Sequence, residues 1–233
     1  MKNFPATAFF CLLSTGTAFA QTAPQVRSVA SFHAVEVSNG IELRLTPGTS
    51  QRVAASADEA DQLARLKTEV RDGVLKISYD RELSESMGFS KTRHLRVDVT
   101  ATTLDALHAS SGARAEVLGA FTTQKLDVEV SSGATLRANF SSTDMRAQVS
   151  SGGVATLAGT AQRLEVGASS GGVFKGDGLL ARACDASASS GGNVAVAVQE
   201  TLTANASSGG DVRYSGSPRV SKHTSSGGSV KGR

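Results

Sequence analysis

The sequence predicts an all-β fold, a parallel β-helix in which successive coils stack to form a solenoid. Three observations support this: a short phrase that recurs, an alternation of apolar and polar residues before it, and a glycine within it. Self-similarity at a period near 20 residues is typical of solenoids, whose repeats pack only on their neighbours. The phrase is Ser-Ser-Gly, and its seven copies begin at Ser110, Ser131, Ser150, Ser169, Ser189, Ser207 and Ser225, at intervals of 18 to 21 residues.

Each phrase is preceded and followed by a strand pattern. In the second copy, Leu126, Val128 and Val130 lie five, three and one residues before the first serine, and polar residues separate them. A period of two indicates a strand with one buried face. The fifth position after the first serine is again apolar in each copy. The segment 104–233 is therefore predicted to form about seven regular coils of 18–21 residues, each a strand, a corner and a strand.

The third residue of the phrase is glycine in all seven copies. Glycine adopts positive φ without a Cβ penalty, so these residues are predicted to be structural turn positions. They are Gly112, Gly133, Gly152, Gly171, Gly191, Gly209 and Gly227. The next residue is Ala113 or Ala134 in the first two copies and glycine in the other five. We therefore expect this second position to require only a small side chain.

Residues 1–20 have the features of a secretory signal peptide. Lys2 supplies the positive end, residues 8–13 form the apolar centre, and Ala18-Phe19-Ala20 is a small-residue cleavage site. The apolar run is too short to span a bilayer, and no other segment is predicted to be transmembrane. We expect an exported protein, in the periplasm or at the cell surface and extracellular.

Residues 21–103 are predicted to form irregular β coils that cap the N-terminal end of the same domain, because an open β-helix end is an exposed edge. Alternation on either side of Asn39-Gly40 predicts a hairpin or a tight corner. Further expected elements are strands within 53–57, 70–79 (turning at Asp72-Gly73) and 95–99, a short helix within 58–66, and an exposed loop at 84–93.

Composition and residue types exclude several function classes. Without residues 1–20, which contain Lys2, 23 of the 24 basic residues remain, against 21 acidic ones. The basic residues form no cluster, so nucleic acid is not an expected partner. The four histidines are scattered, and only Asp211 places an aspartate in the turn slot that a calcium-binding β-roll would need, so no metal and no cofactor is predicted. Cys184, the single thiol of the mature chain, is expected to be buried and structural.

Two segments carry a resemblance to a known family. Residues 32–43, which contain Val35-Glu36-Val37-Ser38-Asn39-Gly40-Ile41, resemble the start of the family named putative auto-transporter adhesin, head GIN domain. The Ser-Gly-Gly coils and residues 214–218 resemble its ending. The resemblance implies an exported, right-handed β-helix with an adhesin-like role and no established catalytic residues. No β-barrel translocator follows the repeats before Arg233, so we do not expect an auto-transporter activity.

One outward column of the predicted solenoid is a candidate ligand-binding surface. Arg137, Lys175 and Arg213, followed by Lys231, lie six residues after the first serine of their copies. A basic stripe along a rod suits a polyanionic glycan, such as a cell-envelope polysaccharide. The column also contains Glu116, Thr156 and Ala195, so an ordinary solvated face is the alternative.

A carbohydrate-active enzyme, a polysaccharide lyase or glycoside hydrolase, is the rival function. Asp127 and Glu129 are expected to point outward, with their Cα atoms about 6.5–7 Å apart, a spacing that suits an inverting glycosidase. The predicted register, however, places Asp127, Arg146 and Glu165 in a column of alternating charge, which favours a solvated face. Aromatic residues make up 5% of the chain and tryptophan is absent. We therefore predict no catalytic residues and a binding or structural module, either adhesin-like or an envelope accessory.

Two further expectations concern the serines and the C-terminal coil. The corner serines are expected to hydrogen-bond through their hydroxyls to the backbone and to one another between coils. The final coil ends at Val230–Arg233 without a cap. An open edge must be shielded by charge or by another subunit, so a homo-oligomer is predicted.

Overall fold

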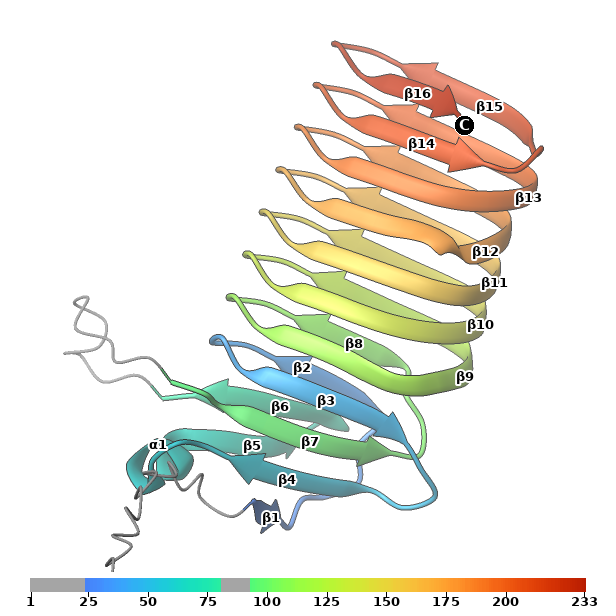
Figure 1. Cartoon of the computed structure of the whole chain (residues 1–233). Helices are drawn as coiled ribbons and strands as arrows, with labels where there is room; N and C mark the ends of the chain where they lie inside the picture. The colour runs from blue at the N-terminus through green and yellow to red at the C-terminus, as the bar shows by residue number, and fades with distance from the viewer. Residues whose placement is uncertain (1–23, 81–92) are drawn as a thin grey trace, which may run out of the picture.

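The computed structural model describes residues 24–80 and 93–233, and these form a right-handed β-solenoid with one coil for each Ser-Ser-Gly phrase (Figure 1). The predicted fold class is confirmed. The predicted signal peptide, and residues 84–92 of the predicted loop, lie outside the described residues.

Five long strands make up the middle of the solenoid. They are β9 (Arg114–Val130), β10 (Thr135–Val149), β11 (Val154–Ala168), β12 (Val173–Ala188) and β13 (Asn193–Ala206). Each strand bends and so contributes to two faces. The first part of β13 pairs with β14 (Asp211–Ser215), and its second part pairs with β15 (Arg219–Thr224). The first parts of these strands, together with β14 and β16 (Ser229–Gly232), form what we call the front face, which is nearer the viewer in Figure 1. The second parts of the strands, together with β15, form the back face.

Neighbouring coils pair in parallel, so equivalent residues stack in columns. Residues of β10 and β11 pair from Thr135 with Val154 to Val149 with Ala168. Inward columns are apolar and outward columns polar, as the alternation in the sequence predicts. The core is one continuous apolar cluster along the axis, in which Phe140 and Phe174 are among the largest fully buried side chains.

Every Ser-Ser-Gly phrase forms a tight turn of the same kind, which lies at the left of each coil in Figure 1. At the fourth phrase, the N–H of Gly172 donates to the carbonyl of Ser169 at 2.8 Å. The two central residues both have positive φ, 49° at Ser170 and 72° at Gly171. This is a type I′ turn. The predicted glycine conformation is confirmed at all seven positions, and the second serine shares it in every phrase.

The corners are joined to one another by backbone hydrogen bonds. The N–H of Gly171 donates to the carbonyl of Ser190 in the next coil at 3.2 Å, and the other phrases repeat this bond up to Gly209. Within residues 24–80 and 93–233, the hydroxyls of these phrases make no hydrogen bond, so the predicted hydroxyl ladder is wrong. Main-chain groups already bond to one another across each corner.

The residue after each glycine is more restricted than the sequence suggested. A Cβ added to Gly172 would lie 2.4 Å from the carbonyl oxygen of Val149 in the preceding coil. Gly153, Gly192, Gly210 and Gly228 meet the equivalent carbonyl at 2.2–2.5 Å. The expectation that this position needs only a small side chain is therefore wrong for the last five coils. Ala113 and Ala134 occur where the closing bond of the turn is longer, 3.0 Å instead of 2.8 Å.

The segment around Asn39-Gly40 is a corner of the solenoid. It joins β2 (Ala34–Val37) to β3 (Glu42–Pro47), which pair with other strands and not with each other. Asn39 and Gly40 have φ of 62° and 73°, and the N–H of Gly40 donates to the carbonyl of Ser111 at 3.0 Å. Ser38-Asn39-Gly40 is therefore an eighth member of the corner column.

The N-terminal end is closed by elements that depart from the coil pattern. Parallel strands β6 (Val74–Tyr79), β7 (Arg96–Ala101) and β8 (Ala106–Ala109) continue the two faces. Antiparallel strands then cover β6 and β7: β5 (Leu66–Arg71) pairs with β6, β4 (Arg52–Ser56) with β7, and β1 (Gln25–Arg27) with β4. Helix α1 (Ala60–Arg65) lies at the same end (Figure 1).

Candidate functional site

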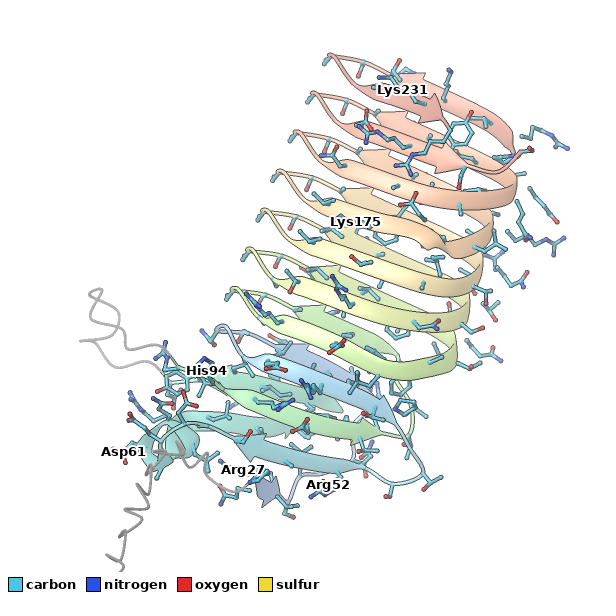
Figure 2. The ribbon with its side chains drawn as sticks, viewed as in Figure 1. Arg27, Arg52, Asp61, His94, Lys175 and Lys231 are labelled. Carbon is cyan, nitrogen blue, oxygen red and sulfur yellow. The ribbon has the colours of Figure 1, made fainter. Side chains whose placement is uncertain are left out.

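The predicted basic column lies on the front face of the solenoid. Arg137 of β10, Lys175 of β12 and Arg213 of β14 share one column, with Thr156 and Ala195 between them. All three basic side chains are exposed. Adjacent coils are about 4.8 Å apart, so successive basic residues are separated by about 10 Å. Figure 2 shows Lys175 and Lys231 on this face.

The column contains a fourth regular member that the sequence analysis missed. Arg44 of β3 pairs in register with Glu116, which pairs with Arg137. Arg44 lies six residues after Ser38, so aligning Ser38-Asn39-Gly40 with the Ser-Ser-Gly phrases would have identified it. We call Arg44, Arg137, Lys175 and Arg213 the basic row. A basic residue therefore recurs in every second coil.

The members of the basic row differ in their electrostatic surroundings. Arg44 lies 3.0 Å from Glu42, and Arg213 lies 2.9 Å from Asp211. Arg137 and Lys175 form no ion pair within the described part of the chain. The neighbouring outward column beside them is uncharged and consists of Thr135, Val154, Val173 and Asn193. The centre of the basic row thus presents two cations without an ion pair, although Glu116 stacks on Arg137 in the same column and Asp177 follows two residues after Lys175.

The back face carries a groove of about 610 Å³ that runs across the coils from β9 to β13. We call this the axial groove. One wall consists of Lys125, Asp144, Arg163, Ala183 and Thr201, the other of Asp127, Arg146, Glu165, Asp185 and Thr203. Between the walls lie Leu126, Met145, Leu164 and Cys184, with Asp105 at the N-terminal end.

Ion pairs in the axial groove run along the walls. Arg163 lies 2.7 Å from Asp144, and Arg146 lies 3.7 Å from Glu165. Each pair joins residues of adjacent coils on the same wall. Within the described residues, no ion pair joins the two walls, which leaves the space between them open.

Only one of the two carboxylates of the rival enzyme hypothesis lines this groove. Asp127 does, and it lies 3.6 Å from His108; Glu129 is not part of the lining. The predicted register of Asp127, Arg146 and Glu165 is correct, but Arg146 pairs with Glu165 and not with Asp127. The structure therefore does not bring the proposed catalytic pair together at a concave site.

Cys184 is buried as predicted, with 5% of its surface exposed. Burial, with a smaller contribution from the negative charge of Asp185, raises the pKa of the thiol to about 12. At neutral pH the side chain is a protonated, poorly nucleophilic core residue.

Three histidines each lie beside a single carboxylate: His33 by Asp105, His94 by Asp58 and His108 by Asp127. Over residues 24–80 and 93–233, no group of three or more His, Cys, Asp or Glu side chains is arranged to hold a metal ion. In the same ranges, no helix has the length and apolar character required to cross a membrane.

Solved structures from Bacteroides and Parabacteroides species have a similar fold. A protein from Bacteroides fragilis described as a putative adhesin superposes with a TM-score of 0.77 at 20% identity, over 91% of this chain and 96% of that chain. A putative adhesin from Parabacteroides distasonis gives a TM-score of 0.63 at 20% identity, over 91% and 96%. A protein from the same species described as a putative lipid binding protein gives 0.58 at 17% identity, over 91% and 97%. At these identities, the TM-scores show a shared fold.

No match was found among curated proteins. The family model described as "Putative auto-transporter adhesin, head GIN domain" matches residues 31–218, which include the Asn39-Gly40 corner and six of the seven Ser-Ser-Gly phrases. The match thus extends over most of the solenoid whose geometry is described above. The chain belongs to this family.

Proposed function

We propose that this protein is an exported, non-enzymatic binding module that holds a polyanionic glycan of the cell envelope along its basic row. The observation that supports this most directly is the recurrence of Arg44, Arg137, Lys175 and Arg213 in every second coil. Membership of an adhesin family and the signal-peptide pattern of residues 1–20 are consistent with a role outside the cytoplasm.

A row of evenly spaced cations suits a linear polymer better than a small molecule. Each exposed Arg or Lys contributes little by itself, because water and salt screen its charge. A polymer that engages one cation binds the next as an effectively intramolecular event, so several weak contacts add up to useful avidity. The preferred ligand carries anionic groups about 10 Å apart, which is the distance across two coils.

The centre of the basic row is expected to contribute most to binding. Arg137 and Lys175 have uncharged neighbours in the adjacent column, whereas Arg44 and Arg213 each share their charge with a nearby carboxylate. A ligand anion must compete with Glu42 or Asp211 for those two residues.

Binding to dextran sulfate and polygalacturonate, with neutral dextran for comparison, tests the proposal. Replacing Arg137, Lys175 and Arg213 together with alanine should weaken binding to the anionic polymers about tenfold or more, since it removes three of the multivalent contacts. The matched control replaces Arg71, Arg182 and Arg219, which removes the same charge from exposed positions outside the front face.

Salt and product analysis complete the test. Raising the salt concentration from about 0.15 M to about 1 M shortens the screening length from about 8 Å to about 3 Å and should abolish binding. Equal loss in both triple variants would show a non-specific charge effect and contradict the basic row as a site. New reducing ends or unsaturated products would contradict the non-enzymatic proposal and favour a lyase or hydrolase.

We also propose that the protein self-associates through its C-terminal coil. Among the described residues, β15 and β16 pair on one side only, with β13 and β14. The other side is an open edge of backbone N–H and C=O groups, which favours pairing with a second copy.

A further inference from the structure

We propose that the axial groove on the back face is a second binding site, for an extended, uncharged glycan chain. It lies on the other face of the solenoid from the basic row, and its ligand has a different chemistry, so it does not depend on the function proposed above. The inference is based on the pattern of charge across the groove, its dimensions and the residues that line it.

Opposite charges face each other across the groove in three successive coils. Lys125 stands opposite Asp127, then Asp144 opposite Arg146, and then Arg163 opposite Glu165. The sign reverses from one coil to the next on both walls. These six side chains have no net charge; Asp105 adds a negative charge at the N-terminal end and Asp185 adds another on β12. A polyanion would be repelled at these two places, whereas an uncharged ligand is not.

The same pattern offers a hydrogen-bond donor and a hydrogen-bond acceptor in each of these three coils. Guanidinium and ammonium groups only donate hydrogen bonds, and carboxylates only accept them. The ion pairs along each wall use only some of these groups' bonding capacity, since an arginine has five N–H donors and a carboxylate about four acceptor sites. Thr201 and Thr203 extend the pattern with hydroxyls, which both donate and accept. Sugar hydroxyls, which also do both, match this arrangement.

The length scale favours a polymer that lies along the axis. The coils repeat about every 4.8 Å, which is close to the length of one sugar ring in an extended β-1,4-linked chain. One sugar residue can therefore meet one coil, and the same contacts can recur along the chain. Leu126, Met145 and Leu164, which lie between the walls, are each only 2% exposed, so a sugar ring would contact mainly the polar walls. Among the described residues no aromatic side chain lines the groove, so we expect weak binding, with a Kd of ~1 mM.

The test is an NMR titration of the protein with cellohexaose and chitohexaose, which are extended and uncharged, and with maltohexaose, whose α-linked chain curves away from the axis. The first two should shift amide signals of the groove strands, and maltohexaose should not. The variant Asp144→Ala/Arg163→Ala removes an ion pair from one wall without changing the net charge. It should weaken binding about tenfold, because half of the wall contacts of each of two adjacent coils are lost.

The matched control is Arg182→Ala/Glu200→Ala. This exposed pair joins adjacent coils at 2.8 Å, as Arg163 and Asp144 do at 2.7 Å, but it does not line the groove. It should bind cellohexaose like the wild type. The proposal is overturned if neither extended hexasaccharide shifts groove signals, if maltohexaose binds equally well, or if both double variants weaken binding to the same extent. Retained dextran sulfate binding in the Asp144→Ala/Arg163→Ala variant would show that the two sites are independent.

Discussion

At the corners, two adjacent residues per coil occupy the left-handed region of backbone space. Glycine does so at little cost, but the serine before it, such as Ser170 with φ of 49°, has a Cβ and is strained there. Asn39 holds the same position in the first corner, and Asn-Gly is the preferred pair in type I′ turns. The serines are tolerated because each corner is held by its closing bond and by a bond to the next coil.

Substitutions at Gly171 and Gly172 separate conformational strain from steric exclusion. Gly171→Ala places a Cβ in open space at φ of 72°, so it should destabilise the protein by about 1 kcal/mol or more. Gly172→Ala directs its Cβ at the carbonyl of Val149, which already accepts a hydrogen bond from Ser169, so it should cost about 2 kcal/mol or more. Denaturant unfolding measures both losses.

Ser170→Gly serves as the control for these two variants. It removes a side chain from a position with positive φ and should leave the free energy of unfolding nearly unchanged or slightly higher. If Gly172→Ala were as stable as the wild type, the closeness of adjacent coils at this point would not limit the residue, contrary to what we infer.

At the scale of the strand, β15 departs from the columns that it continues. The inward positions Leu202, Ala204 and Ala206 of β13 are all buried, and the residues that stack on them are Val220, Lys222 and Thr224. Lys222 and Thr224 are exposed. A charge at an inward position is one of the devices by which edge strands limit pairing with other chains. Lys222 therefore weakens the self-association that the open edge would otherwise favour.

We predict that Lys222→Val increases self-association. The change extends the apolar column to the last coil and removes a charge that a partner strand would have to bury. Light scattering over a range of protein concentrations should show weak association of the wild type and a higher average mass for the variant. Lys231→Val, an outward substitution on β16 that removes the same charge, should have a smaller effect. A wild type that stays monomeric at high concentration would contradict the predicted homo-oligomer, and an unchanged mass in Lys222→Val would contradict the shielding role.

For the whole molecule, we expect the stack of coils to fold without a bound ion. The only aspartate in the turn slots, Asp211, lies 2.9 Å from Arg213, so its charge is already balanced. We predict that EDTA changes neither the β-sheet circular dichroism signal nor the melting temperature. Added calcium should leave both unchanged as well. A clear loss of β signal on chelation would show that the turns bind calcium.

The repeating units of the solenoid could be predicted from the sequence alone. The geometry of one coil requires a period near 20 residues, an apolar alternation and a glycine at the corner, so every copy of the repeat shows these three features. The same register predicted the column of Arg137, Lys175 and Arg213, because parallel stacking places equivalent residues side by side. Cys184 was placed in the core by the same alternation.

Other features depend on contacts between coils and became visible only in the tertiary structure. The restriction at Gly172 comes from a carbonyl in another coil, and the place of Arg44 in the basic row depends on β3 lying between β7 and β9. The axial groove is likewise a property of several strands at once. Its walls consist of outward residues from five strands that the parallel register brings together, so no single repeat shows the groove.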